Sequence, residues 1–295
     1  MKTFSRIAAA IALVSSGSVF ADDNIAVQTQ VGVFNLATST QLEALGGFNE
    51  VYQTQIGALN LSTALQVGFI SVFNDINHLQ VGALNNAFSL QDGFITVDSD
   101  ATINQVGVLN QATTFQSNSL FNDATINQVG VLNGATIGQN ESAFNDATVN
   151  QVGILNLANI NQSASFGNTA LANQFGILNV ANHLQQGNGN TSVSNQAGIL
   201  NFADVLQVGN GNDSVITQVG ALNIADHDQF GDDNLASTLQ AGVLNVAYVG
   251  QTGDGNAAFT AQAGALNVHI TTQTTDSNLA VGTQLGVGNL GVIIQ

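Results

Sequence analysis

The sequence predicts an all-β fold, a β-solenoid in which strand–turn–strand rungs of about 22–25 residues stack and become cross-β on assembly. Three observations support this prediction. The stretch ATINQVGVLN occurs at 101–110 and again at 124–133, and a close copy, ATVNQVGILN, follows at 147–156. Residues of one kind recur at every second position within each copy. Extra residues enter the repeat at one place only, so the rest of the pattern is undisturbed.

Glutamine marks the repeat, in an unbroken series from Gln30 to Gln295 with steps of 11 residues or slightly more. Two kinds of half-repeat alternate. The first reads Q-x-G-x-L-N-x-A-x-x-x, as in QVGILNLANIN from Gln151, and the second reads Q-x-G-x-G-N-x-S-x-x-x, as in QQGNGNTSVSN from Gln185. Two halves form a unit of 25 residues early in the chain, 23 in the middle and 22 later. Eleven full units and one closing half therefore make one continuous architecture without a linker.

An 11-residue period also fits three turns of an α-helix, which would give a right-handed coiled coil. Two features argue against a helix. Every first half contains a Gly, which costs roughly 1 kcal/mol inside a helix. The 14-residue second halves that begin at Gln41, Gln66 and Gln91 carry their insertion between the Gln and the next Asn-type position. A helix would lose its face at each insertion, whereas a turn only lengthens, so we expect strands joined by turns and insertions that lie in the turns.

Counting in steps of two along the repeat separates the two faces of each strand. Asn133, Ala135, Ile137 and Gln139 share one face, and the residues between them vary freely from copy to copy. Recurrent residues are expected inside, where stacked amides hydrogen-bond from rung to rung and avoid the roughly 1–3 kcal/mol cost of an unpaired polar group. By the same count, a Gly of each first half shares the inner face. The predicted structural ladder comprises Gln105, Gly107, Asn110, Gln116, Asn122, Gln128, Gly130, Asn133, Gln139, Asn145, Gln151, Gly153, Asn156, Gln162, Gln174, Gly176, Asn179, Gln185, Gln196, Gly198, Asn201, Gln207, Gln218, Gly220, Asn223, Gln229, Gln240, Gly242, Asn245, Gln251, Gln262, Gly264, Asn267 and Gln273.

The ends of the repeat determine what the solenoid is expected to do. The repeat begins near Asn24 and reaches Gln295, and neither end carries a polar helix, a Pro or a divergent segment that would cap it. A soluble solenoid normally needs caps, because an uncapped rung exposes backbone N–H and C=O groups together with apolar surface. We therefore expect each end to template the other end of the next molecule, and the product to be an axial homopolymeric fibre.

The first residues of the chain read as a Sec-type signal peptide. Lys2 and Arg6 precede an apolar run at 7–14, and small residues follow as far as Ala21, the expected cleavage point. The apolar run is too short to span a bilayer. The predicted divisions of the chain are a signal peptide at 1–21, a short N-terminal segment at 22–29 and the repeat solenoid at 30–295.

Composition excludes several classes of function. After the signal peptide the chain contains all 19 acidic residues and neither Lys nor Arg, so no basic patch can form and we expect no binding to nucleic acids or to anionic membranes. No transmembrane segment is found in the rest of the sequence, so we expect no membrane insertion. The chain has no Cys, and export is therefore not used to gain disulfides. The turns of the second halves are rich in Gly and acidic residues, whereas those of the first halves carry Leu in ten of twelve copies.

The repeat resembles a known family. The pattern Q-x-G-x-x-N-x-A-x-x-x-Q, seen as QVGVLNGATIGQ at 128–139 and QFGILNVANHLQ at 174–185, is similar to the curlin repeat. Curlins are subunits of curli, the extracellular functional amyloid fibres of bacterial biofilms. The resemblance implies secretion through the periplasm, a fibre at the bacterial cell surface, and roles in adhesion and surface colonisation. It also implies a nucleator subunit, an outer-membrane secretion pore and periplasmic chaperones as partners.

Few residues suggest site chemistry. The four histidines, His78, His183, His227 and His269, all fall on the inner face, and His183 and His227 occupy the same slot two rungs apart. That separation, roughly 9.6 Å, is too large for one metal ion to bridge, so we interpret the histidines as ladder fillers.

The segment DHDQFGDDN offers weak candidates for a Ca²⁺ site, although it matches neither the EF-hand loop nor the Ca²⁺-binding nonapeptide repeat. Its acidic residues are Asp226, Asp228, Asp232 and Asp233. The simpler interpretation is that they are charged turn residues that slow aggregation.

The sequence predicts neither an enzyme nor a cofactor. It lacks a phosphate-binding glycine loop and any arrangement of Ser, His and Asp that stands out. The function expected is that of a structural subunit of curli-like fibres. The alternative is a secreted β-solenoid adhesin that does not polymerise and binds cations or glycans.

Overall fold

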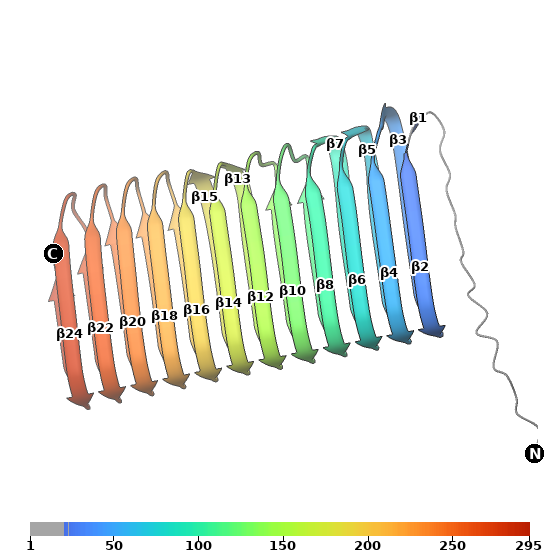
Figure 1. The fold of residues 1–295 in the computed structure, drawn as a ribbon. Coiled ribbons are helices and arrows are strands. Elements are labelled where there is room, and N and C mark those ends of the chain that lie inside the picture. Colours follow the sequence, from blue (N-terminus) through green and yellow to red (C-terminus); the bar gives the residue numbers. More distant parts are fainter. Residues whose placement is uncertain (1–20, 23) are drawn as a thin grey trace, which may run out of the picture.

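The computed structural model describes residues 21–22 and 24–295, and every regular element within them is a β-strand. The strands form two parallel sheets, and in each sheet they follow one another along a rod from its N-terminal to its C-terminal end (Figure 1). The described residues contain no helix, so none there is long and apolar enough to cross a membrane. The predicted all-β solenoid is confirmed. The predicted signal peptide at 1–21 lies outside the described residues, apart from Ala21.

Odd-numbered and even-numbered strands belong to different sheets. The odd-numbered sheet contains β1 (Ala21–Asp22), β3 (Leu36–Gly47), β5 (Leu61–Val72), β7 (Asn86–Val97), β9 (Gln111–Ser117), β11 (Gly134–Asn140), β13 (Leu157–Phe166), β15 (Val180–Asn188), β17 (Phe202–Val208), β19 (Ile224–Phe230), β21 (Val246–Thr252), β23 (Val268–Gln273) and β25 (Leu290–Ile294). The even-numbered sheet contains β2 (Ile25–Val33), β4 (Glu50–Ala58), β6 (Asp75–Ala83), β8 (Asp100–Val108), β10 (Asp123–Val131), β12 (Asp146–Ile154), β14 (Thr169–Ile177), β16 (Thr191–Ile199), β18 (Asp213–Ala221), β20 (Leu235–Val243), β22 (Ala257–Ala265) and β24 (Leu279–Val287).

Neighbouring strands pair in register, so each residue meets its counterpart in the next repeat. Strand β10 pairs with β8 and β12, which places Gln128 between Gln105 and Gln151. One even-numbered strand and the odd-numbered strand after it form a rung, and the even-numbered sheet counts twelve strands. At roughly 4.8 Å per rung the rod is about 58 Å long.

The space between the sheets is narrow and is filled by one layer of side chains from each sheet. On β10, Ala124 and Ile126 are 1% and 0% exposed and Gln128 is 0% exposed, whereas the alternate residues Thr125 and Asn127 are only partly buried. Small or aliphatic residues occupy the two inner positions nearest the middle of many strands, and Ser, Thr or His takes such a position in others, as Ser192 and Ser194 do on β16; Gln and Asn flank them. The period-two alternation of the sequence therefore separates the interior from the surface in the structure.

The insertions of the early repeats lie in strands, contrary to the expectation that they lie in turns. Strands β3, β5 and β7 have 12 residues each and continue to Gly47, Val72 and Val97. The inserted segments pair with one another, as in Leu45 with Ile70 and Ile70 with Ile95. Because three successive rungs carry insertions of equal length, their backbones can pair in register, and this pairing extends the sheet.

The residue before each ladder Asn adopts a left-handed conformation. After the even-numbered strands this residue is Leu ten times, and its φ lies between 56° and 59°. Such a conformation costs a bulky L-residue roughly 1–2 kcal/mol. We call this row of turn residues the Leu edge; it comprises Leu59, Leu84, Leu109, Leu132, Leu155, Leu178, Leu200, Leu222, Leu244 and Leu266.

Candidate functional site

The glutamine ladder runs unbroken through both sheets, with each side chain donating to the next rung. In the even-numbered sheet, Nε2 of Gln105 lies 2.9 Å from Oε1 of Gln128, and Nε2 of Gln128 lies 2.8 Å from Oε1 of Gln151. Nε2 of Gln128 also donates to the backbone oxygen of Gln111 on the facing sheet, at 3.0 Å. A carbonyl oxygen can only accept, so this second bond fixes which end of the amide points along the rod. The amides of the ladder glutamines therefore donate toward the C-terminal end.

The asparagine ladder has the opposite polarity. Oδ1 of Asn133 accepts from the backbone N–H of Asn156 at 3.1 Å and from its Nδ2 at 3.2 Å. Nδ2 of Asn133 in turn donates to Oδ1 of Asn110 on the preceding rung at 3.1 Å, and also to the backbone oxygen of Gly153 at 3.0 Å. A backbone N–H can only donate, so Oδ1 must face the following rung. Each rung thus presents Gln donors and Asn acceptors toward the C-terminal end.

The two outermost rungs leave parts of these ladders open. At the C-terminal end, Nε2 of Gln284 donates to the backbone oxygen of Val268 at 2.8 Å and has no following Gln among the described residues. Oδ1 of Asn289 likewise receives no donor there. At the N-terminal end, Oε1 of Gln30 receives no donor within the described part of the chain, whereas its Nε2 is bonded to Gln55. The open groups of one end are therefore the complements of those at the other.

The structure places the predicted Gln and Asn ladder residues in the interior, each at most 2% exposed. The predicted glycines differ: Gly130 and most of its counterparts are partly exposed, and Gly264 is exposed. Gly130 has a φ of +133°, and a Cβ added to it would lie 1.9 Å from the backbone oxygen of Gly153. The alternation breaks at this residue, because the backbone turns and the chains approach closely. Glycine here permits contact between rungs and is not an interior side chain.

Each of three histidines is buried between two hydroxyl groups. Nδ1 and Nε2 of His227 lie 2.8 Å from Oγ of Ser214 and 2.7 Å from Oγ1 of Thr238. Burial lowers the pKa of His227 and of His78 to about 3, and the pKa of His183 to about 4. These imidazoles are therefore neutral at neutral pH. His269 is buried as well, and burial lowers its pKa.

The four acidic residues proposed as weak Ca²⁺ ligands have separate roles in the structure. Asp226 and Asp228 lie on β19, where burial and the charges of Asp228 and Asp204 raise the pKa of Asp226 to about 6. Asp232 accepts from the backbone N–H of Asn210 at 2.8 Å, and Asp233 is a left-handed turn residue. Within residues 21–22 and 24–295, no three His, Cys, Asp or Glu side chains converge in a manner that would hold a metal ion.

A row of carboxylates that sequence reasoning missed follows the starts of the even-numbered strands. Its members, Glu50, Asp75, Asp100, Asp123 and Asp146, are register partners on successive rungs. Burial, and then the charges of its neighbours in the row, raise the pKa of Asp100 to about 6. The available signal was the position of each acid, one residue after the ladder Asn or Ser of a second half. Like charges one rung apart repel each other, so this row is a source of strain at neutral pH.

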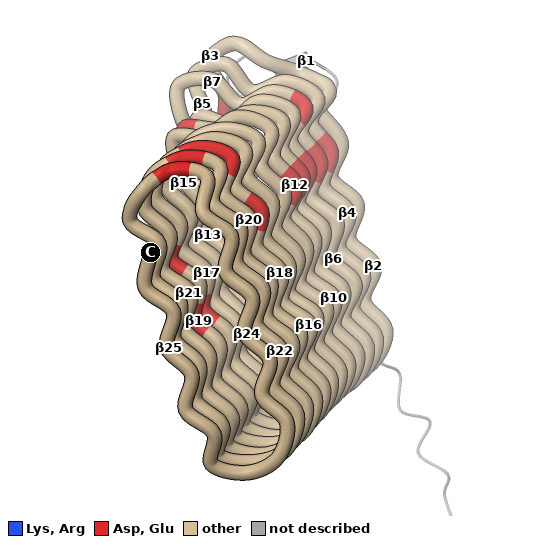
Figure 2. The backbone as a smooth tube through the Cα atoms, turned by 90° about the vertical axis from the view of Figure 1, so that its left-hand side faces the viewer, with Lys and Arg blue, Asp and Glu red and all other residues tan. Residues whose placement is uncertain are grey.

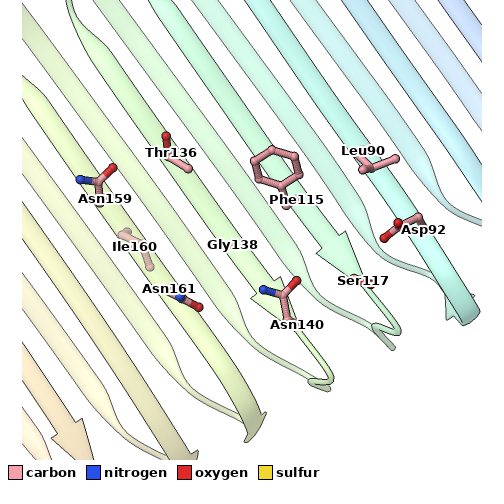
Figure 3. A pocket seen from close by; sticks show the side chains of 10 residues that line it. All are labelled: Leu90, Asp92, Phe115, Ser117, Thr136, Gly138, Asn140, Asn159, Ile160 and Asn161. Carbon is pink, nitrogen blue, oxygen red and sulfur yellow. The ribbon is translucent and has the colours of Figure 1, made fainter.

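A hollow lies on the outer face of the odd-numbered sheet, over β7 to β13 (Figure 3). Gly138 on β11 leaves a gap between Phe115 on β9 and Asn161 on β13, and the hollow has a volume of about 480 Å³. A Cβ at Gly138 would meet nothing closer than 3.8 Å, so the backbone does not require glycine here. The hollow is an open feature of the surface and shares no residue with the ladders.

A comparison with models of protein families found one family that matches part of the repeat. The family model of the Curlin associated repeat matches residues 231–264, from the turn after β19 into β22. A comparison with curated proteins found no match. The Gln of the matched segment pairs in register with the Gln before it, as Gln240 does with Gln218, and the same pairing continues along the even-numbered sheet. The matched pattern and the architecture of the remaining rungs thus agree, and the chain carries the curlin-associated repeat.

Proposed function

We propose that this chain is the structural subunit of an extracellular curli-like amyloid fibre that grows by end-on stacking and serves biofilm matrix, adhesion and surface colonisation. The observation that carries the proposal is the complementarity of the two outermost rungs. The C-terminal end offers Gln donors and Asn acceptors, and the N-terminal end offers the reverse. The role is structural, without catalysis or a cofactor. The curlin repeat and the β-solenoid fold support the same function.

Stacking continues the ladders across the junction between two molecules. Strand β24 of one copy pairs with β2 of the next, so that Gln284 donates to Gln30 and Asn289 accepts from the backbone N–H of Asn35. In the other sheet, β1 covers only Gly46 and Gly47 of β3, which leaves the earlier part of that strand available to β25. Each junction thereby repeats the bonds of an internal rung.

The junction has one polarity. Two C-terminal ends brought together would place Gln donors against Gln donors, and two N-terminal ends would place acceptors against acceptors. Buried polar groups without partners cost about 1–3 kcal/mol each, so such junctions are strongly disfavoured. Fibres therefore grow head to tail.

The partners and the location of the fibre follow from the curlin resemblance. The subunit is exported through the periplasm and leaves the cell by an outer-membrane secretion pore, with periplasmic chaperones keeping it unassembled. A nucleator subunit starts the fibre at the cell surface. The net negative charge makes subunits repel one another, which keeps them soluble until the C-terminal end of one subunit binds the N-terminal end of the next.

A seeded thioflavin-T time course on freshly desalted mature protein tests the proposal. We expect a lag phase that preformed seeds abolish. Replacing Gln284 by Lys should prevent elongation, because an extra charge would be buried at the junction, whereas replacing the outward Thr136 by Lys should leave elongation intact. A flat trace that seeds do not change, from a chain that is already β-rich by circular dichroism, would overturn the proposal in favour of a self-contained adhesin.

A further inference from the structure

The Leu edge is exposed on ten successive rungs of the rod. Its ten leucines retain between 39% and 54% of their surface, the extremes being Leu178 and Leu266. The strand residues before the turns extend the apolar surface, with Val129 at 46% and Ile154 at 41% exposed. The edge is therefore a continuous apolar stripe that the fold itself does not cover.

The turn geometry does not call for leucine. On the opposite edge, the residue before the ladder Asn occupies the same left-handed conformation and is Gly167, Gly189 or Gly211 in three successive rungs. The same position also accepts Asp233 and Ser277. The opposite edge also has Phe at this position in four rungs, at Phe48, Phe73, Phe121 and Phe144, so its composition is mixed, whereas the Leu edge keeps leucine in ten successive rungs. A strained, exposed and repeated leucine indicates a contact outside the molecule.

The stripe also contains no charged residue. None of the twelve first-half segments, from the Gln to the residue after the Asn, contains an acidic residue, although the chain carries a net charge of −17. Figure 2 shows the acidic residues at the other edge and on the side of β17, β19 and β21, away from the turns that follow the even-numbered strands. Two copies of this acidic chain repel each other except where these uncharged turns meet.

We infer that the Leu edge is a lateral interface between two parallel-running rods of this chain, distinct from the end-on junction. A second copy carries the same side chains at the same rung spacing, so the leucines of the two rods interdigitate in a dry seam. Ten rungs at roughly 4.8 Å each make a stripe about 48 Å long, which at about 13 Å wide has on the order of 620 Å² per copy. A pair then has about 1,250 Å², near the lower bound for specific interfaces.

Small-angle X-ray scattering on an absolute scale tests the inference, because it reports mass per unit length. One chain of 30.3 kDa over roughly 58 Å gives about 0.5 kDa per Å for a single rod and about 1.0 for a pair. We expect the paired value for the native chain. Leu132→Asp with Leu155→Asp should halve it, because the added charges face each other across the seam.

Matched variants separate the seam from the fold. Phe121→Asp with Phe144→Asp adds the same charge to the same rungs at left-handed positions on the opposite edge, and should keep the paired value. Leu132→Gly with Leu155→Gly relieves the backbone strain, so it should fold and still halve the mass per length. A native value of about 0.5 kDa per Å, or an unchanged value in both leucine variants, would overturn the inference.

The same scattering measurement distinguishes a failure of the lateral interface from a failure of end-on stacking. If molecules do not stack axially, forward scattering still distinguishes a lateral pair from one 30.3 kDa rod. A pair that the leucine variants dissociate then supports the seam without the fibre, and a single rod at all concentrations contradicts it.

Discussion

Nε2 of His183 lies 2.7 Å from Oγ of Ser194, and both side chains are buried between the two sheets. The other ring nitrogen, Nδ1, lies 2.8 Å from Oγ of Ser192. The two hydroxyls satisfy a neutral imidazole, which has one donor and one acceptor. They do not supply the counter-charge that an imidazolium would need in this interior, and this makes the rod sensitive to acid.

Acid should destabilise the rod through its histidines. Burial lowers the pKa of His183 to about 4 and that of His227 to about 3 in the folded chain. In the unfolded chain these imidazoles bind protons below about pH 6.5, so the unfolded state binds more protons than the folded state at mildly acidic pH. The free energy of unfolding therefore falls as the pH falls through this window. We expect His183→Gln with His227→Gln to reduce the loss between about pH 7.5 and 4.5 by roughly 2 kcal/mol per site. Denaturant unfolding of the unassembled protein measures it, and an equal loss in both proteins would contradict the prediction.

The carboxylate row should make the free energy of unfolding rise, rather than fall, as the pH is lowered. Burial and neighbouring acids raise the pKa of Asp100 to about 6, above its unfolded value, so its folded form is favoured at low pH and loses stability as the pH rises through about 6. Since this side chain is partly exposed, screening limits the effect, and we expect Asp100→Asn to stabilise the rod by about 1 kcal/mol at about pH 7.5 and not at about pH 3.5.

The control for this charge effect is Asp213→Asn. The register partners of Asp213 are Thr191 and Leu235, so no acid lies directly above or below it. Urea midpoints at the two pH values give the comparison. A gain for Asp213→Asn as large as that for Asp100→Asn would show that the row itself contributes nothing.

Alanine should be tolerated at one glycine of β11 and not at one of β10. In Gly130→Ala the new Cβ would lie 1.9 Å from the backbone oxygen of Gly153, and the φ of +133° disfavours any L-residue. We expect a loss of at least about 1–3 kcal/mol. Gly138→Ala meets its nearest atom at 3.8 Å and should lose nothing measurable. Thermal unfolding followed by circular dichroism compares the two, and similar melting temperatures would refute the close-approach role.

Charges placed in the ladders should prevent folding and assembly together. Gln128 and Asn133 are 0% and 1% exposed, and replacing both by Lys buries charge without a partner and breaks both ladders at one rung. Thr136→Lys adds a charge at an alternate, partly buried position of β11 and should form fibres at the native rate. Electron microscopy and the seeded thioflavin-T assay give the readout, and equal inhibition by the two variants would invalidate the assignment of faces.

The sequence alone was sufficient for the features that repeat with period two. Gln128 and Asn133 each recur in every unit, and in-register stacking forces recurrent residues into columns, so counting in steps of two places both of them, with Ile137 on the same face, in the interior. The same count failed at Gly130, where the backbone leaves the strand conformation. A pattern of alternating faces holds no information about where the alternation stops.

Features that depend on contacts between rungs were harder to foresee. The row from Glu50 to Asp146 requires the register of five rungs across units of unequal length. The extension of β3, β5 and β7 requires knowing that their insertions pair with one another, which follows only once the rungs are stacked. The left-handed turns of the Leu edge run against the preferences of leucine, so local propensity predicts the wrong residue there.

The strands of the odd-numbered sheet are longer at the N-terminal end of the rod than at the C-terminal end, and this difference affects the outline expected for the proposed fibre. Strands β3, β5 and β7 span 12 residues each, whereas β21, β23 and β25 span 7, 6 and 5. Each molecule is therefore broader at its N-terminal end, and a head-to-tail filament steps abruptly from a narrow cross-section to a wide one at every joint. In the proposed fibre this outline would repeat with a period of about 58 Å, which would add a long axial reflection to the roughly 4.8 Å spacing of the strands and would distinguish the two directions of the filament.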